Sequence, residues 1–345
     1  MNQCPSDVAC GPAKPCGIST SLRSNQHGFT MVELLVAMVI SLLIALAAIS
    51  ALTVTRQGFT TVDASSQLRD NGRFISDLIQ RLGVQSGYRD TLWAAFPAPS
   101  TMSAFATDPD PNITGVNNAL VSASDPFNAS TARTTIDGSD ILILRYQAAE
   151  TFPGSGIADR SMIDCMGKPA TTPAADRYAR ISSVLHVQVN QGEPSLMCTT
   201  VGASAGTFST QPLIQGVENF QVLYGVDGVT AGTAPPVAPG DTVPESYLRA
   251  DQLVVAGNAI ATNANWRRVR SVRIGIVLRG PANSAQDRSA QTYYPFGPAP
   301  DSSGGAKGSA LSSTNDTGTV FTPTADGRLR QVVTFTVHLR NDQGL

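Results

Sequence analysis

A long apolar stretch near the N-terminus constrains this chain more than any other feature. From Phe29 to Thr55 the sequence contains one charged residue, Glu33, and neither proline nor glycine. At a rise of 1.5 Å per residue, it predicts a helix of about 40 Å, long enough to cross the hydrocarbon core of a bilayer. A secretory signal peptide has a shorter apolar part and a cleavage site after it. We therefore expect a single membrane-spanning helix that stays on the mature protein.

The residues before this stretch indicate its orientation. Lys14 and Arg23 make the segment weakly basic, although Asp7 opposes them. Basic flanks tend to remain in the cytoplasm. We therefore expect a cytoplasmic N-terminus and a body after Arg56 that faces outward.

Glu33 is unusual because a carboxylate within an apolar membrane helix is costly, about 2.5–3.5 kcal/mol at the bilayer centre. Cleavage between Gly28 and Phe29 would create an ammonium group one helical turn away. The carboxylate can then pair with the amine of its own chain, or with that of a neighbouring subunit, which would fix the stagger between packed helices. The alternative is a glutamate tolerated at the membrane interface.

Composition and motifs argue against several classes of function. Charged residues make up 14% of the chain and the formal net charge is −2, which gives no electrostatic reason to expect nucleic acid. Arg267, Arg268, Arg270 and Arg273 alternate with apolar residues, so we interpret them as the solvated face of a strand. The sequence lacks a nucleophile elbow, a phosphate-binding loop and a zinc-binding helix motif, so we expect neither an enzyme nor a cofactor.

The histidines and cysteines of the body do not predict a metal site. His186 and His338 are not at ligand spacing from a cysteine, and the strand pattern predicts that His186 lies on a polar surface. Cys165 and Cys198 are an even pair, which in an exported domain suggests a disulfide. Two buried free thiols are the alternative.

The rest of the chain predicts an α+β fold, in which an amphipathic stalk helix packs on an antiparallel sheet with one covered face. The stalk, residues 56–87, has Phe59, Val62, Phe74 and Leu82 in its apolar stripe, with glycines that weaken it at 58 and 72 and end it at 83 and 87. Residues 97–138 are expected to form a surface loop. Alternation with a period of two predicts strands at 139–146, 181–190, 217–227, 269–280 and 330–341.

The segment Gly28-Phe29-Thr30-Met31-Val32-Glu33-Leu34-Leu35 resembles the cleavage and methylation site of type IV pilins and pseudopilins. This resemblance implies that a prepilin peptidase cuts after Gly28 and methylates Phe29, and that Glu33 guides assembly. The organisation expected from it is a leader at 1–28, an assembly helix at 29–55, the stalk at 56–87 and a β-rich head at 88–345. The leader is longer than in many pilins and contains Cys4, Cys10 and Cys16.

The body resembles the PilW-type minor pilins through Gly87-Tyr88, the strands SDILILRY and VENFQVLYGVD, and the C-terminal Leu339-Arg340-Asn341. This resemblance implies a minor pilin that helps to initiate a type IV pilus at the cell surface. The implied partners are other minor and major pilins, contacted through the N-terminal helix, the prepilin peptidase and the inner-membrane assembly platform. The alternatives are a type II secretion pseudopilin and a pilus-tip adhesin that binds through loops 228–248 and 281–328.

Overall fold

The computed structural model describes residues 28–94, 111–122, 125–127, 138–176, 178–201, 206–238, 240–300, 306–309, 316 and 318–341. The expected leader before Gly28 and most of the expected 97–138 loop lie outside these ranges. The chain divides into two compact units, Met1–Thr55 and Arg56–Leu345. Each unit is described separately below.

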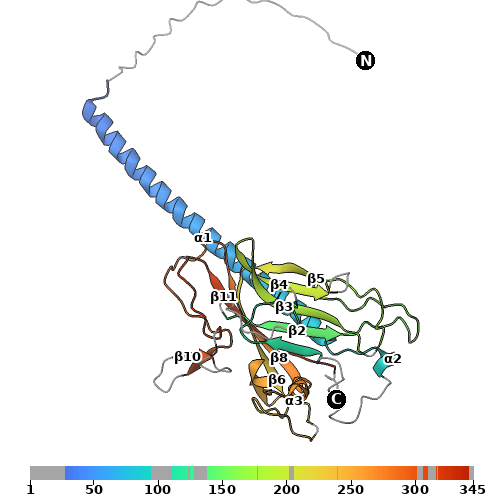
Figure 1. Cartoon of the computed structure of the whole chain (residues 1–345). Helices are drawn as coiled ribbons and strands as arrows, with labels where there is room; N and C mark the ends of the chain where they lie inside the picture. The colour runs from blue at the N-terminus through green and yellow to red at the C-terminus, as the bar shows by residue number, and fades with distance from the viewer. Residues whose placement is uncertain are drawn as a thin grey trace, which may run out of the picture. The chain divides into compact units, whose positions relative to one another are not determined.

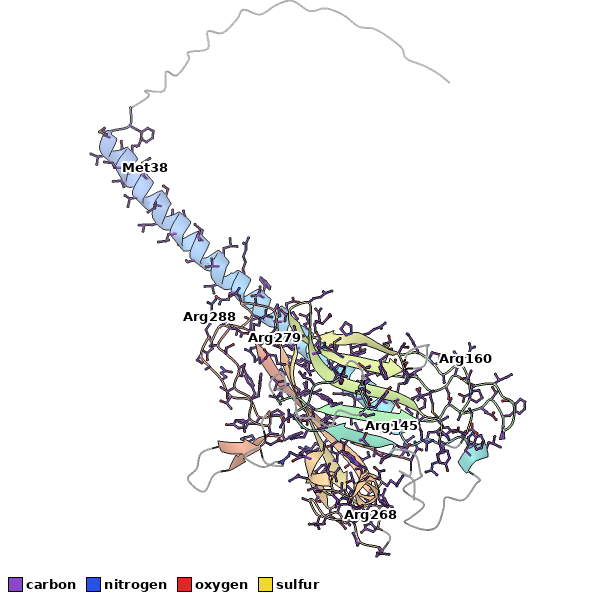
Figure 2. The ribbon with its side chains drawn as sticks, in the orientation of Figure 1. Met38, Arg145, Arg160, Arg268, Arg279 and Arg288 are labelled. Carbon is purple, nitrogen blue, oxygen red and sulfur yellow. A yellow bond between two sulfur atoms is a disulfide. The ribbon has the colours of Figure 1, made fainter. Side chains whose placement is uncertain are left out.

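The first unit contains the beginning of helix α1, which runs from Met31 to Gln85 (Figure 1). Every described residue up to Thr55 is exposed. The apolar side chains in this part project freely, as they do around Met38 (Figure 2). A helix of this length and apolarity can cross a membrane, as the sequence predicts.

The second unit begins with the stalk half of α1, which packs on the head through one face. The helix is continuous through Gly58 and Gly72, where the sequence predicted weak points, and Gly83 does not end it, because α1 continues to Gln85. Gly87 follows the helix with a left-handed φ of 79°, as is typical of a glycine just after a helix end. The buried residues recur at spacings of three and four: Ala64, Leu68, Gly72, Ile75, Ile79, Leu82 and Gly83.

Three members of the predicted stripe do not pack on the head. Phe59, Val62 and Phe74 are 71%, 69% and 52% exposed, and at 100° per residue they lie opposite the buried face. Gly72 and Gly83 replace them as packing positions. A Cβ atom would come 2.8 Å from Val333 at residue 72 and 2.5 Å from Val337 at residue 83. The two glycines therefore let the helix approach strand β11 closely.

The head contains two main antiparallel sheets and a short ribbon (Figure 1). The five-stranded sheet has the order β1-β2-β3-β4-β5, and the four-stranded sheet has the order β11-β8-β6-β7. The strands of the first are β1 (Ile113–Val116), β2 (Ile141–Tyr146), β3 (Ile181–Asn190), β4 (Glu193–Val201) and β5 (Phe208–Gln215). Those of the second are β6 (Val217–Val226), β7 (Ser246–Leu248), β8 (Val269–Arg279) and β11 (Arg330–His338). The ribbon pairs β9 (Pro298–Pro300) with β10 (Ala306–Ser309), and the short helices are α2 (Thr91–Ala94), η2 (Asp251–Leu253) and α3 (Ala259–Trp266).

The α+β class and all five predicted strands are confirmed, but the head has two main sheets where one was predicted. One large core contains inward side chains of both sheets and of the stalk, including Leu185, Phe220 and Ile75. A second cluster covers the opposite face of the five-stranded sheet, where Ala119 packs on Ile141, Ile143 and Val184. This sheet is therefore covered on both faces rather than one.

The covered second face explains why the prediction for His186 was wrong. His186 is 1% exposed, and its Nε2 lies 2.9 Å from Thr199 Oγ1. Burial lowers the pKa of His186 to about 4, so the ring is neutral at pH 7. Alternation placed it correctly on the more polar face, but residues around 119 cover that face.

The prediction of a solvated face for the four arginines was also wrong, because two of them are buried and the other two, Arg270 and Arg273, are half-buried. Arg267 and Arg268 are 2% and 5% exposed. The guanidinium of Arg268 donates to the carbonyl oxygens of Pro236 and Ala238, which lie in the loop after β6. Arg270 Nε lies 3.4 Å from Asp227 Oδ2. These side chains therefore fasten a loop to β8 rather than face water.

Candidate processing and assembly site

The start of α1 is held by a reciprocal pair of hydrogen bonds between Thr30 and Glu33. Thr30 Oγ1 accepts from the backbone N–H of Glu33 at 3.3 Å, and Glu33 Oε2 accepts from the backbone N–H of Thr30 at 3.1 Å. The Thr30 hydroxyl also lies 3.1 Å from Glu33 Oε2. This is a capping box, in which both side chains satisfy N–H groups that the first helical turn leaves unpaired.

The capping box was missed by the sequence analysis, although the Thr-x-x-Glu spacing before an apolar run is its signature. It gives Glu33 a structural role in the uncleaved chain. The pairing with a Phe29 ammonium stays a prediction for the cleaved form. Both roles are compatible, because Phe29 is the residue directly before the N-cap.

The side-chain hydroxyl groups between Met31 and Thr55 are all satisfied within the helix. Each donates to a carbonyl oxygen three or four residues earlier, at 2.8 or 2.9 Å: Ser41 to Met38, Ser50 to Ala47, Thr53 to Ser50 and Thr55 to Ala51. Such internal pairing is what a helix surrounded by lipid requires. Glu33 is thus the one charged group of the segment, and none of the described residues forms an ion pair with it.

The expected cleavage site is accessible. Phe29 is 85% exposed and, like Gly28, precedes the first helical residue. A Cβ atom at Gly28 would meet no described atom within 4 Å. The fold of the described chain therefore gives no steric reason for glycine at this position.

The two body cysteines meet in the large core. Cys165 and Cys198 are 2% and 0% exposed, and their sulfur atoms are bonded in the structure. The bond joins the segment between β2 and β3 to strand β4 across a sequence separation of 33. Cys165 also donates its backbone N–H to Ser183 Oγ, so the segment is attached to the five-stranded sheet at two points.

An ion-pair network joins the two main sheets, and the sequence analysis did not predict it. Glu193 at the start of β4 contacts Arg279 at the end of β8 and Arg328 before β11. Glu218 on β6 lies 3.0 Å from Arg279 Nη1 and 2.6 Å from Arg330 Nε. Partial burial raises the pKa of Glu193, but hydrogen bonds and charge from Arg279 and Arg328 outweigh it, and the net pKa is lowered. Figure 2 labels Arg279 in this region.

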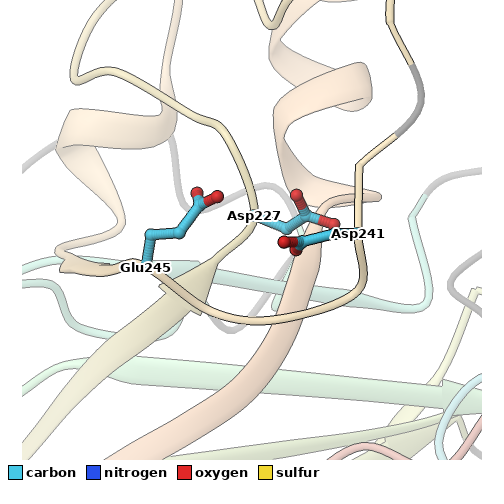
Figure 3. A group of neighbouring side chains, drawn as sticks. All are labelled: Asp227, Asp241 and Glu245. Carbon is cyan, nitrogen blue, oxygen red and sulfur yellow. The ribbon is translucent and has the colours of Figure 1, made fainter.

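Three carboxylates also gather on the loop after β6 (Figure 3). Ligand atoms of Asp227, Asp241 and Glu245 all lie within 4.8 Å of one another. The chain's own groups already engage them: Asp227 Oδ2 accepts from the backbone N–H of Thr242 and lies near Arg270, and Glu245 accepts from the N–H of Gly228. We interpret this cluster as a stabilised loop.

Comparisons with known protein families give two separate matches, one at the N-terminal segment and one in the head. Residues 23–49 match the prokaryotic N-terminal methylation motif, a range that includes Gly28, Phe29 and Glu33. Residues 184–341 match the type IV pilus-assembly protein W family, PilW, a range that contains β4 to β11. The SDILILRY strand lies outside both ranges.

No curated protein sequence matches the chain. Among solved structures, a type IV-like pilin from Thermus thermophilus aligns with 80% of this chain and 98% of its own length, at 14% identity and a TM-score of 0.36. Similarity at this TM-score is too low to assign a fold, so the fold described above rests on the strands and helices of this chain. The two family matches, by contrast, cover the N-terminal motif and the body separately. The chain is a type IV pilin-like protein that carries a prepilin N-terminal methylation motif and, over residues 184–341, a region that matches PilW.

Proposed function

We propose that the chain is a minor pilin that a prepilin peptidase cleaves after Gly28 and methylates on Phe29, and that it takes part in the initiation and assembly of a type IV pilus. The apolar helix holds the precursor in the inner membrane with its head in the periplasm. After extraction from the membrane, the same helix packs among those of other minor and major pilins. The match to the methylation motif and the PilW match support this proposal.

The observation that carries the proposal is the single acid at Glu33. Every hydroxyl of the surrounding apolar segment is satisfied by the helix itself, whereas the charge of Glu33 is not balanced by a described cation. Cleavage after Gly28 supplies a cation at Phe29, in the same chain or in a neighbour. The exposed glycine, which the described fold does not require, supports recognition of Gly28 by another protein.

The capping box makes a sharp test possible, because it separates the charge of Glu33 from its hydrogen bonding. Glutamine at the third helical position also completes a capping box. Glu33→Gln therefore keeps the helix cap and removes the charge, whereas Glu33→Ala removes both. We expect both variants to be cleaved and methylated normally but to lower the number of surface pili at least tenfold.

Thr30→Ala is the matched control, because it removes the capping hydroxyl and keeps the carboxylate. We expect it to retain surface pili near the wild-type number. Normal piliation with Glu33→Gln would show that capping alone explains the glutamate, and the charge-pairing proposal would then be wrong. Electron microscopy and quantification of sheared pili measure the outcome.

A type II secretion pseudopilin uses the same N-terminal motif, so the Glu33 variants do not separate the two systems. The PilW match favours the pilus. Deleting the gene and measuring pili and secreted enzymes in parallel distinguishes them, because a pilus subunit affects the first and a secretion pseudopilin affects the second.

A further inference from the structure

The outermost strands of the two main sheets differ in how they are protected against pairing. β1 and β7 are short, ending after Val116 and Leu248 respectively. β5 contains Pro212, which lacks a backbone N–H, and its pairing with β4 has a register shift at Leu196 and Met197. Short length, proline and bulges are the devices by which natural sheets prevent edge-to-edge association.

β11 has none of these devices and lies at the edge of the four-stranded sheet (Figure 1). Its residues pair with β8 without a register shift from Arg330 to His338. The strand has neither proline nor glycine, and its central part from Gln331 to Val337 is uncharged and rich in β-branched residues. A long, regular edge of this kind is a template for another strand.

The register shows which backbone groups point away from β8. The backbone N–H of Leu339 donates to the Arg270 carbonyl at 3.0 Å, and that of Gly280 donates to the Leu329 carbonyl at 2.7 Å. Because hydrogen bonding alternates along an antiparallel strand, the odd-numbered residues face β8. The residues that direct their N–H and C=O groups outward are Arg330, Val332, Thr334, Thr336 and His338.

Within the described ranges no other strand pairs with β11 on this side, and Thr334 and His338 are exposed. We propose that the free edge of β11 is a docking site for an extended strand of another pilin subunit, which adds antiparallel to the sheet. This inference rests on the proposed function, because it takes the partner from the same assembly. Main-chain hydrogen bonds would supply affinity, and alternate side chains would supply specificity.

The direction of the stalk excludes one occupant, a second copy paired antiparallel through the same strand. Gly72 lies against Val333 and Gly83 against Val337, so the stalk and β11 run in the same direction. Antiparallel pairing of two β11 strands would reverse one stalk and place the two Arg56 residues at opposite ends. In each subunit the membrane-spanning segment ends directly before Arg56. Two subunits anchored in the same membrane therefore cannot adopt that arrangement. With this self-pairing excluded, we assign the partner strand to a different pilin of the same assembly.

The side chains beside the edge define the chemistry of the partner strand. On the face toward the stalk it meets Val333, Phe335 and Val337, which are packed on the core and favour apolar neighbours. On the other face the Thr334 hydroxyl already donates to the carbonyl oxygen of Pro295, so the partner strand meets Thr336, which favours β-branched or hydroxyl side chains. A strand that alternates apolar residues with threonine or serine fits both faces.

The test places a photo-crosslinking amino acid at His338 in the full-length chain, in cells that carry the other pilins, with Gln211 on β5 as the control position. We expect an adduct at position 338 with another pilin, in membranes and in sheared pili, and none at position 211. Thr336→Pro removes one outward N–H and should lower the adduct about tenfold, whereas Thr336→Val keeps the N–H and should leave it unchanged.

Formation of the Cys165–Cys198 disulfide in each variant checks that the head has folded. The inference is overturned if no adduct forms, or if one forms only from position 211. It is also overturned if position 338 crosslinks within the chain or to β11 of a second copy. Equal effects of proline and valine at residue 336 would likewise contradict it. Its failure is distinguishable from that of the proposed function. Normal pili with Glu33→Gln would contradict the assembly role of the Glu33 charge. If Glu33→Gln abolishes pili as expected but the otherwise wild-type chain gives no adduct from position 338, only the strand pairing is contradicted.

Discussion

The side chains of the apolar segment of α1 and those of the head find their bonding partners in different places. From Met31 to Thr55 every side chain is exposed, and each hydroxyl bonds to the backbone of the same helix. In the head, stability depends on contacts between residues far apart in the chain, such as Cys165 with Cys198 and Glu218 with Arg330. Substitutions in the apolar segment should therefore impair assembly while leaving the head folded. Substitutions in the head should first lower its free energy of unfolding.

The largest expected effect on the head comes from the disulfide. Cys165→Ala with Cys198→Ala removes a cross-link over a sequence separation of 33, which in the loop-entropy model is worth about 3–4 kcal/mol of unfolding free energy. Denaturant unfolding of the detergent-solubilised chain measures it, and treating the wild-type protein with reductant should reproduce the effect. Cleavage after Gly28 should be unchanged. Loss of cleavage in the double variant would contradict the claim that the apolar segment and the head behave independently.

The ion-pair network gives the next effect. Glu218→Ala leaves Arg279 and Arg330 partly buried without their shared carboxylate and should cost about 3 kcal/mol at pH 7. Glu218→Gln keeps a hydrogen-bond acceptor of the same size and should cost less. Equal unfolding free energies for the wild type and the alanine variant would show that the network does not hold the two sheets together.

His186 predicts a pH dependence that belongs to the head alone. Because burial lowers its pKa from 6.5 to about 4, the unfolded chain binds a proton that the folded chain does not between these values. Stability should therefore fall as the pH falls from 6.5 toward 4, by about 2–3 kcal/mol. His186→Gln should remove this part of the loss in unfolding measurements at several pH values. An unchanged pH slope in the variant would contradict the burial of a neutral ring.

The glycines of α1 give the smallest effect and the closest comparison, because both substitutions lie in one helix. Gly83→Ala places a Cβ 2.5 Å from Val337 and should cost about 1–3 kcal/mol. Gly58→Ala meets no described atom within 4 Å and should stabilise the helix by about 0.5–1 kcal/mol. Thermal unfolding followed by circular dichroism measures both. Changes of the same sign would contradict the packing of the stalk on β11.

The parts of the structure predicted from sequence are those with a local cause. The apolar helix and five strands follow from the spacing of their own apolar residues, as in β8 and β11. β5 was missed because FSTQPLIQ has no alternation, and its ladder depends on pairing with β4. His186 and Arg268 were misassigned because what covers them comes from elsewhere in the chain, around Ala119 and Pro236.

The candidate site divides in the same way. Gly28, Phe29 and Glu33 lie within a few residues of one another, so one short motif contains them. The Thr30–Glu33 capping box has its sequence signature in the same motif, although the sequence analysis missed it. The Glu193–Arg279–Glu218–Arg330 network has no such signature, because its members come from four segments whose meeting depends on the packing of two sheets.

The account depends most on the chemical state of the N-terminus once the protein has entered a fibre. Intact-mass and peptide mass spectrometry of protein from sheared pili tests it most directly. We predict a chain that begins at Phe29 and carries one methyl group on its amine. A chain that still contains Met1, or one that begins after Thr55, would lack the cation next to Glu33 and would contradict the account.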